Sequence, residues 1–223
     1  MDSLGSKSAR EKHAGGAATA APEKGDMSQP AESAQPTLPS LADLPKDTRV
    51  LHIGDSFAGA LGYELNREFE AHGIRGTLKY EKSTYIPTWA WNKELGEYLW
   101  KYRPDLVVIT LGGNELKIPD PNARAKTVRR LVDRLKGKPC VWIGIPLWEG
   151  SNPALMHVIA ENVAPCLFLD SSALLPDLQR ARDGIHPNTE ARRTWAKAVI
   201  HWLRQQVQPE ANSWVWRTDA TDL

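Results

Sequence analysis

The sequence predicts an α/β fold in which one parallel, doubly wound sheet carries helices on both faces. Apolar runs of strand length alternate along the chain with amphipathic segments of helix length, which is the order typical of strand-helix units. The strand-length runs are almost continuously apolar, as strands are when both faces of a sheet are covered. We therefore expect a three-layer, flavodoxin-like domain with five strands.

Five short runs rich in apolar residues are the predicted strands. They cover residues 50–53, 77–80, 106–111, 141–145 and 167–169. Because a segment of helix length separates each run from the next, the chain is expected to cross back over the sheet each time. All five strands are then parallel.

Helices are expected in the segments between these strands, where apolar residues recur at helical spacing. The predicted helices cover residues 57–72, 88–102, 123–135 and 153–163, and a last one covers 189–206. Trp100, Trp195 and Trp202 recur on helix faces at spacings that suit core packing. Trp142 lies inside a predicted strand, so all four indoles are expected to be buried.

The first 46 residues differ in composition from the rest of the chain. They are rich in Ala, Gly, Pro, Ser, Glu and Gln and show no apolar periodicity, a pattern typical of disorder. We therefore expect a low-complexity tail at 1–46, a folded domain at 47–208 and a polar C-terminal extension at 209–223. Trp214 and Trp216 in this extension are expected either to fold back onto the domain or to contact a partner.

The tail carries no apolar segment typical of a signal peptide and no run long enough to span a bilayer. Tails of this composition commonly tether an extracytoplasmic enzyme to an anchor or follow a signal. We expect a periplasmic or secreted protein, with a cytosolic protein as the alternative. The formal net charge of +1 gives no reason to expect nucleic acid or a polybasic membrane contact.

The two cysteines, Cys140 and Cys166, each lie at the start of a predicted strand. If these strands are neighbours, the cysteines share one edge of the sheet and a disulfide is geometrically possible, which would indicate an oxidising compartment. Two buried thiols that pack as small apolar residues are the alternative.

Three polar motifs follow predicted strands or precede the last helix. They are Gly54-Asp55-Ser56-Phe57, Gly112-Gly113-Asn114-Glu115 and Asp183-Gly184-Ile185-His186-Pro187. In parallel, doubly wound sheets, ligands bind at the carboxyl ends of the strands. The topology therefore predicts that the three motifs converge on one site, at the strand ends opposite to the cysteines.

Ser56 is the candidate nucleophile because a strand delivers it to a helix N-terminus. There its backbone amide and the positive end of the helix dipole favour an oxyanion. A hydroxyl needs a base to take its proton, and His186 is the candidate. Asp183 lies three residues earlier and is placed to orient the imidazole. The side-chain amide of Asn114 is expected to face the developing negative charge.

These motifs resemble those of the SGNH hydrolases, also called GDSL esterases and lipases, over residues 49–208. In this resemblance Ser56 matches the nucleophile of the family's Gly-Asp-Ser motif, and Asn114 matches its oxyanion-hole asparagine. Asp183 and His186 match its Asp-x-x-His motif. The resemblance implies the SGNH hydrolase fold, a Ser-His-Asp triad and an oxyanion hole.

One motif of the family is altered. The family usually has a glycine after the second strand, whose backbone amide completes the oxyanion hole, whereas residues 80–88 contain no glycine. The backbone amide of Ser83 or of Thr84 is expected to take this role, since the donor belongs to the main chain. The permissive dihedral angles of glycine are lost.

The sequence therefore predicts a serine ester hydrolase that removes a small acyl group, such as acetyl, from a saccharide or another polar alcohol. Trp148, Trp89 and Gly113 are the candidate substrate-binding residues, and Trp91, which follows the same altered motif as Trp89, is considered for the same role. An O-acetyltransferase with the same triad and a non-catalytic carbohydrate-binding domain are the alternatives.

No cofactor is expected, because no phosphate-binding loop follows the first strand. His52 lies within a predicted strand and is expected to be a core histidine. His157 and His201 have no companions at metal-ligand spacing, so no metal site is predicted.

Overall fold

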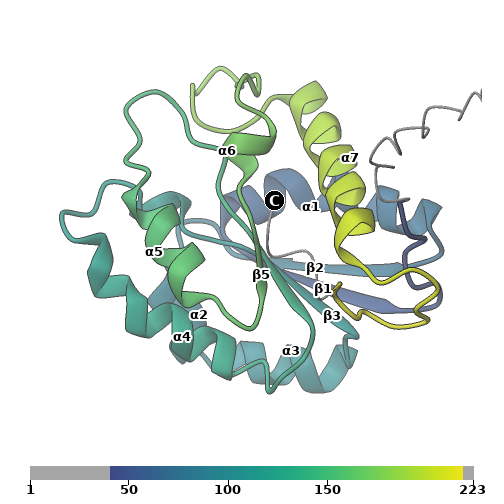
Figure 1. Ribbon diagram of the computed structural model, residues 1–223. Coiled ribbons are helices and arrows are strands. Elements are labelled where there is room, and N and C mark those ends of the chain that lie inside the picture. Colours follow the sequence, from purple (N-terminus) through teal and green to yellow (C-terminus); the bar gives the residue numbers. More distant parts are fainter. Residues whose placement is uncertain (1–40, 218–223) are drawn as a thin grey trace, which may run out of the picture. The chain divides into compact units, whose positions relative to one another are not determined.

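Five parallel strands form one sheet in the computed structural model, which describes residues 41–217 (Figure 1). Their spatial order is β2-β1-β3-β4-β5. The strands are β1 (Arg49–Gly54), β2 (Arg75–Tyr80), β3 (Leu106–Thr110), β4 (Cys140–Ile143) and β5 (Leu167–Leu169). The winding reverses between β1 and β3, so the carboxyl ends of these two strands flank the switch point. The predicted fold class is confirmed.

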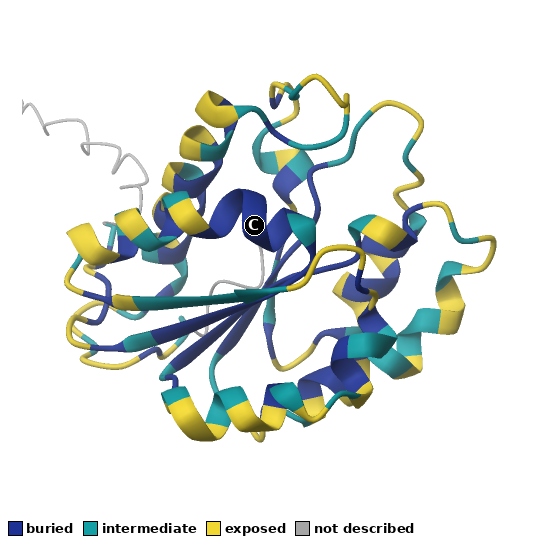
Figure 2. Cartoon of the chain, turned by 180° about the vertical axis from the view of Figure 1, so that it is seen from behind, coloured by how far each residue is buried: buried dark blue, intermediate teal, exposed yellow. Residues whose placement is uncertain are grey.

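Helices cover both faces of the sheet (Figures 1 and 2). One layer contains α1 (Ser56–Ala71), α6 (Ser171–Leu174) and α7 (Thr189–Gln206), and the other contains α2 (Ile86–Trp91), α3 (Glu94–Tyr102), α4 (Ala125–Asp133) and α5 (Ala154–Asn162). Two short 3-10 helices, η1 (Gly113–Glu115) and η2 (Pro121–Arg124), lie between β3 and α4. The helices turn their exposed sides outward, and the central strands are buried (Figure 2).

The segment predicted as one helix at 88–102 forms two helices, α2 and α3. Asn92 has an extended backbone, and its side-chain oxygen accepts a hydrogen bond from the Leu95 N–H at 3.3 Å. Asparagine competes in this way with the helical hydrogen bonds of its neighbours. The first of the two helices also begins two residues earlier than predicted, with Pro87 in its first turn.

Three of the four tryptophans predicted to lie in the core do pack there. Trp142 and Trp195 are fully buried, and Trp202 is half-buried against the core. For Trp100 the prediction is wrong, because its side chain is 77% exposed. The inner face of α3 is formed by Leu95, Tyr98, Leu99 and Tyr102, and position 100 lies on the opposite side of the helix.

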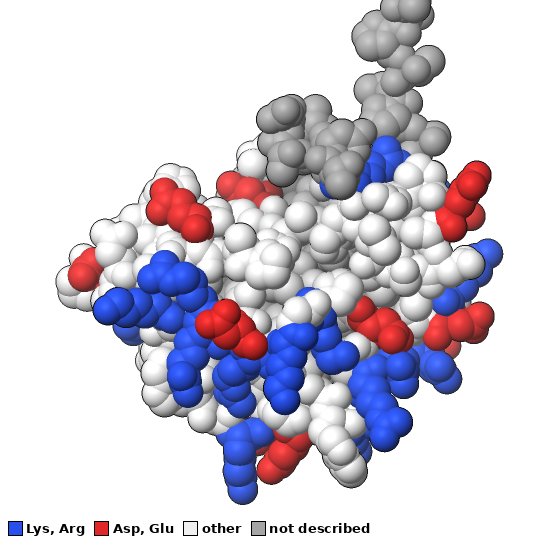
Figure 3. All heavy atoms as spheres, turned by 60° about the horizontal axis from the view of Figure 1, so that its bottom comes forward, with Lys and Arg blue, Asp and Glu red and all other residues white. Residues whose placement is uncertain are grey.

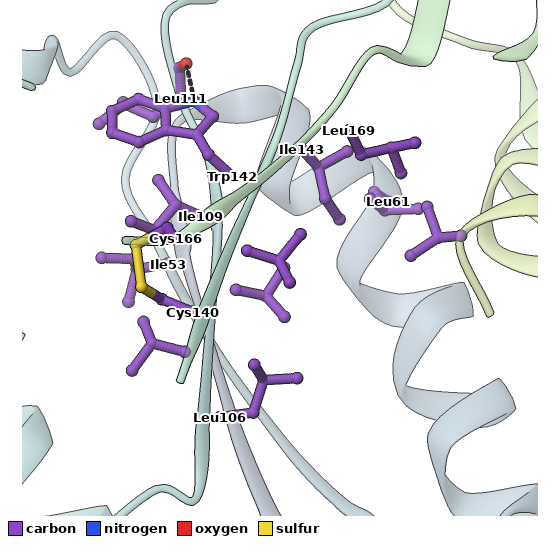
Figure 4. Close-up of a cluster of buried hydrophobic side chains, with 14 of the residues drawn as sticks. Ile53, Leu61, Leu106, Ile109, Leu111, Cys140, Trp142, Ile143, Cys166 and Leu169 are labelled. Carbon is purple, nitrogen blue, oxygen red and sulfur yellow. Dashed lines mark hydrogen bonds between the residues drawn. A yellow bond between two sulfur atoms is a disulfide. The ribbon is translucent and has the colours of Figure 1, made fainter. Parts of the chain in front are cut away.

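Cys140 and Cys166 form a disulfide between the start of β4 and the residue before β5 (Figure 4). The bond lies among the buried side chains that Figure 4 shows. Because Cys140 is the first residue of β4 and Cys166 directly precedes β5, the disulfide is at the amino ends of these strands. Trp142 lies two residues further along β4, and its indole donates a hydrogen bond to the carbonyl of Leu111 at 3.2 Å.

The ends of the described chain pack against the domain. Ala42 and Leu44 are buried, although they precede the predicted boundary at residue 46. Trp214 is also buried and donates a hydrogen bond from its indole to the Thr48 hydroxyl at 3.1 Å, so the C-terminal extension folds back. The rest of the predicted tail, residues 1–40, lies outside the described residues. None of the helices within residues 41–217 is long and apolar enough to cross a bilayer.

Candidate active site

Ser56 is the first residue of α1 and lies directly beyond the carboxyl end of β1. The turn between strand and helix requires Gly54, whose φ is 151° and where an added Cβ would lie 1.8 Å from the carbonyl oxygen of Thr110. The N–H groups of the first turn have no partner within a helix. The Ser56 amide is therefore presented at the positive end of α1.

Ser56, His186 and Asp183 form a continuous chain of hydrogen bonds. The distance from Ser56 Oγ to His186 Nε2 is 2.8 Å, and that from His186 Nδ1 to Asp183 Oδ2 is also 2.8 Å. The other carboxylate oxygen of Asp183 accepts the backbone N–H groups of Ile185 and His186. The structure thus brings together three residues that were predicted from the sequence.

The hydrogen bond from His186, with the two backbone N–H groups, lowers the pKa of Asp183 to about 2. The carboxylate is therefore ionised at neutral pH. An ionised acceptor at Nδ1 favours the tautomer with a proton on Nδ1, which leaves Nε2 free to accept the serine proton. The arrangement can generate a serine nucleophile.

The loop that carries His186 is held by Arg180, a residue that the sequence analysis missed. The Arg180 guanidinium donates to the carbonyl oxygens of Ile185 and Leu147, and the Ala181 N–H donates to the carbonyl oxygen of His186 at 2.7 Å. Arg180 therefore joins the histidine loop to the loop after β4. In the sequence, the only indication of this role is that an arginine stands six residues before the histidine.

Asp55 links the end of β1 to the turn after β3. Its buried carboxylate accepts three backbone N–H groups, from Phe57 at 2.8 Å, Gly112 at 3.1 Å and Gly113 at 2.9 Å. Burial raises the pKa of Asp55 to about 6, against these hydrogen bonds, which lower it. Asp55 is thus a helix cap that also fixes the position of the residue after Gly113, which is Asn114.

Gly113 does not contact the cleft as a substrate-binding residue. Its N–H is taken by Asp55, and an added Cβ would lie 2.5 Å from the ring of Phe57. The glycine is required for this close packing.

The loop after β2 holds Ser83 in the left-handed region, with a φ of 60°. This is a conformation that glycine adopts readily and that other residues rarely take, so at Ser83 the loop has a backbone shape that would suit a glycine. The N–H groups of Ser83 and Thr84 have no hydrogen-bond partner among the described residues. Both therefore remain candidate oxyanion donors.

Asn114 lies against this loop. Its exposed side-chain amide donates one hydrogen bond to the carbonyl oxygen of Thr84 at 2.9 Å, and an amide NH₂ has a second N–H to donate. The Thr84 hydroxyl donates to the carbonyl oxygen of Glu81 and accepts the indole N–H of Trp89. Side-chain hydrogen bonds therefore fix the loop in its shape.

Glu115 is a second buried anchor that the sequence analysis did not identify. Its carboxylate is fully buried, accepts the Ile86 N–H at 2.7 Å and pairs with the guanidinium of Arg124. It thereby connects η1, which carries Asn114, to the start of α2 and the loop before it. In the sequence, the only indication of this role is that Glu115 directly follows Asn114, the candidate residue of the oxyanion hole.

The three tryptophans considered for substrate binding have different environments. Trp89 is only 3% exposed and hydrogen-bonded to Thr84, so it belongs to the core, contrary to the prediction. Trp91 is exposed, but its ring lies 4.1 Å from the guanidinium carbon of Arg130 on α4. Trp148 is half-buried and stacks on Phe57 with ring centroids 5.7 Å apart, and Phe57 in turn contacts the His186 ring at 4.9 Å.

A cleft of about 400 Å³ opens beside the three hydrogen-bonded residues. Besides Ser56, Asp183 and His186, it is lined by Gly59, Ala60, Tyr63, Tyr80, Lys82 and Arg192. Two phenols and two cations thus surround the nucleophile, and the sequence analysis had identified none of them. They come from α1, β2, the loop after β2 and α7, which only the fold brings together.

His52 lies in β1, and its side chain is fully buried. Its Nε2 lies 2.9 Å from the Thr110 hydroxyl, and burial lowers its pKa to about 3. It is a neutral core histidine, as predicted. Within residues 41–217, no three His, Cys, Asp or Glu side chains are grouped so that they could hold a metal ion.

A family model described as "Protein of unknown function (DUF459)" matches residues 49–153. Protein BcsX of Komagataeibacter xylinus is 28% identical over 116 residues. This match covers 45% of the chain and 44% of BcsX. The chain thus spans less than half the length of this curated relative.

Several solved structures are similar over most of their length. TesA has a TM-score of 0.58 at 21% identity and covers 71% of this chain and 98% of its own. The lipase/acylhydrolase from Enterococcus faecalis has a TM-score of 0.55 at 14% identity. The match covers 74% of this chain and 99% of the Enterococcus protein.

A protein described as lipolytic and of the G-D-S-L family, from Desulfitobacterium hafniense, has a TM-score of 0.53 at 16% identity and covers 69% of this chain and 98% of its own. At sequence identities of 14%, 21% and 16%, the structural similarity shows that the fold is shared and shows nothing about activity. The chain has the three-layer fold of the SGNH hydrolases, which is the fold of the GDSL lipases and esterases.

Proposed function

We propose that the protein is a serine ester hydrolase that removes a small acyl group, such as acetyl, from a saccharide or another polar alcohol. The observation that carries this proposal is the hydrogen-bond chain from Ser56 through His186 to Asp183, with 2.8 Å at both links. It lies at the end of the sheet where doubly wound folds bind ligands.

In the first half of the reaction, Ser56 Oγ bonds to the acyl carbon and its proton moves to His186 Nε2. The N–H of Ser56 and the amide of Asn114 stabilise the oxyanion, with the Ser83 N–H as third donor and the Thr84 N–H as its alternative. The bond to the alcohol oxygen then breaks, and His186 protonates the leaving alcohol.

In the second half, water attacks the acyl-enzyme. His186 takes one proton of the water as the new bond to the acyl carbon forms, and the bond to Ser56 Oγ breaks. The proton returns to the serine, and the acid leaves. Asp183 keeps the imidazole oriented and stabilises its positive charge in both halves.

The walls of the cleft favour a polar alcohol over a lipid. Tyr63 and Tyr80 meet edge to face with centroids 6.3 Å apart, and phenol rings of this kind can pack on a sugar face while their hydroxyls form hydrogen bonds. Lys82 and Arg192 add two cations. Trp148 is the candidate wall for the acyl group.

The test is the hydrolysis of p-nitrophenyl acetate and of acetylated saccharides by the wild type and by Ser56→Ala. We expect the variant to lose hydrolysis and to lose labelling by a fluorophosphonate probe, followed as a mass shift. Equal rates for the two proteins would refute the mechanism. Rates that rise with acyl chains longer than butyrate would instead refute the proposed acyl size.

An O-acetyltransferase with the same triad is the second candidate, because the cleft is polar enough to admit an acceptor sugar as well as water. Added saccharide acceptors would then divert the acyl-enzyme from hydrolysis to a new ester. A non-catalytic carbohydrate-binding domain is the third, because residues 80–88 lack the glycine that the family usually has and several aromatic side chains are exposed. Stoichiometric, Ser56-dependent labelling would exclude it.

We also propose that the domain acts in an oxidising compartment. The disulfide between Cys140 and Cys166 supports this location, because structural disulfides are rare where thiols are kept reduced. Thiol alkylation of the protein from its native cells, with and without reduction, tests it. Two free thiols in the unreduced sample would contradict it.

A further inference from the structure

The helix layer opposite to α1 and α7 has a strongly basic outer surface. Residues 124–138 alone contain seven of the 28 Lys and Arg residues and only one of the 27 Asp and Glu residues. The remainder of the chain therefore carries more negative than positive charge. Figure 3 shows Lys and Arg side chains spread over this side of the molecule, and the net charge of +1 conceals their segregation.

Seven exposed cations from α3, from α4 and from the residues that flank these helices define this basic face. They are Lys93, Lys101, Arg103, Lys126, Arg129, Arg130 and Lys136. None of the seven forms an ion pair with a carboxylate in the part of the chain that the structure describes. Their charge therefore remains available to an anionic partner.

The interactions that these cations do make are with neutral groups. Arg130 donates to the carbonyl oxygen of Ala90 and lies over the ring of Trp91, and Arg129 donates to the side-chain oxygen of Asn162. Lys101 lies over the ring of Tyr102 at 5.5 Å. Such contacts hold the side chains in place without neutralising them. Two exposed carboxylates, Glu97 and Asp133, dilute the positive charge of the face.

Two tryptophans project from the same helix layer. Trp91 is 61% exposed and Trp100 is 77% exposed. Trp100 lies with Lys93, Gly96, Glu97 and Lys101 around a shallow hollow on the outer side of α3. Apart from its chain neighbours and the backbone of α3, no residue of the described range 41–217 lies within 4 Å of the position that a Gly96 Cβ would take, so the neighbouring indole is open to a partner.

We propose that the basic face docks on the surface of a bilayer that contains anionic lipid. Exposed indoles between long cationic side chains suit the boundary between headgroups and acyl chains, where the ring is buried and the cations reach phosphate. Clustered Lys and Arg attract anionic headgroups. The cleft is lined by residues of α1, β2, α7 and the loops beside them, so docking through α3 and α4 leaves it open.

The test compares vesicles of phosphatidylcholine with vesicles of an equimolar mixture of phosphatidylcholine and phosphatidylglycerol, by co-sedimentation at low and high salt. We expect the protein to sediment with the anionic vesicles alone and to be released by salt. The triple variant Lys93→Gln, Lys126→Gln, Lys136→Gln should bind them more weakly by on the order of a hundredfold.

A matched variant removes three exposed cations from outside the basic face. It carries Lys46→Gln, Arg75→Gln and Lys197→Gln, has the same net charge as the first triple variant, and should bind nearly as well as the wild type. Equal binding of the two triple variants to anionic vesicles would overturn the proposal. It would show that binding depends on the net charge of the protein and not on the position of the cations. Thermal melting of both variants shows that they are folded.

Brominated phosphatidylcholine in the anionic vesicles tests the role of the indoles. We expect quenching of the tryptophan fluorescence of the wild type and a smaller fractional change for Trp100→Ala. Unaltered fluorescence of the wild type, or binding to a soluble acidic polysaccharide without binding to vesicles, would overturn the lipid assignment.

Discussion

The residue after Lys82 is a serine in a backbone conformation that glycine adopts more readily. Ser83 has a φ of 60°, which costs an L-residue roughly 1–2 kcal/mol relative to the right-handed region. The hydrogen bonds of Thr84 to Asn114, Glu81 and Trp89 hold the adjacent peptide. The loop keeps its unpaired N–H groups because its neighbours fix its shape.

Ser83→Gly should therefore be tolerated. The relief of the positive φ offsets the greater freedom of glycine in the unfolded chain, so the free energy of unfolding should change by less than about 1 kcal/mol. Ester hydrolysis should persist, because the expected donor is main chain. Urea denaturation measures the free energy of unfolding, and turnover of p-nitrophenyl acetate measures ester hydrolysis. A loss of turnover as large as that of Ser56→Ala would instead assign a role to the Ser83 hydroxyl.

Asn114→Ala should cripple turnover without unfolding the protein. Removal of one oxyanion donor typically costs about a hundredfold to a thousandfold in kcat, and Asn114 is exposed, so little packing is lost. Asn114→Asp, which keeps the shape and removes the donor, is the matched control and should be equally slow. Full activity of either variant would exclude Asn114 from the oxyanion hole.

At the scale of elements, buried charges connect the segments that surround the site. Asp55 ties β1 to the turn after β3, and Glu115 ties η1 to the start of α2. Each carboxylate satisfies backbone N–H groups that would otherwise be buried without a partner. Both carboxylates stand in the sequence motifs beside Ser56 and Asn114. Neither was given this connecting role, because nothing local in the sequence shows that positions 55 and 115 are buried.

Glu115→Gln should destabilise the protein by about 3 kcal/mol, because the pair with Arg124 is broken in a buried setting. The glutamine oxygen can still accept the Ile86 N–H, but its NH₂ group would face the guanidinium. Glu97→Gln, on the exposed side of α3, is the control and should change the free energy of unfolding by less than about 0.5 kcal/mol. Similar urea midpoints for the two variants would exclude the anchoring role.

His52 in β1 should make the protein sensitive to mild acid. Burial lowers its pKa from 6.5 to about 3, so the unfolded chain binds a proton that the folded chain does not. Its contribution is complete above pH 6.5 and is lost as the pH falls from there towards 3, by about 1.4 kcal/mol for each pH unit over much of this range.

His52→Gln, which can still hydrogen-bond Thr110, should flatten the dependence of the urea midpoint on pH between 7 and about 4. His157→Gln, on the exposed side of α5, should leave it unchanged. Identical pH profiles for the wild type and His52→Gln would show that His52 is not the titrating group.

At the scale of the whole molecule, the disulfide and the candidate site occupy opposite ends of the strands. The bond joins cysteines 26 residues apart, and a loop of this size restricts the unfolded chain enough to contribute about 3 kcal/mol. Because the strands are rigid and the site lies at their other ends, the bond is expected to act on stability and not on chemistry.

The double variant Cys140→Ala, Cys166→Ala should therefore unfold at lower urea concentration, with a loss of about 3 kcal/mol, and keep its turnover with p-nitrophenyl acetate in the absence of urea. A reductant should lower the midpoint of the wild type and leave that of the double variant unchanged. A wild-type midpoint that does not respond to reductant under conditions shown to break the bond would contradict this contribution.

By itself, the sequence determined the order of strands and helices, because the period of apolar residues is a local property. It also pointed to Ser56 and Asn114, since residues that follow parallel strands lie at the same end of the sheet. It pointed to Asp183 and His186 as a polar motif just before the last helix. It misjudged Trp89, Trp100 and the break at Asn92, where the outcome depends on what lies on each side of a helix.

Only the tertiary structure decided which groups are buried and which charges gather. The burial of Asp55 and Glu115, the left-handed Ser83, the disulfide and the basic face of α3 and α4 all depend on segments far apart in the chain. A near-zero net charge is a sum over the whole sequence. Folding distributes that sum in space, and so the polar cleft and the basic face can be read only from the packed structure.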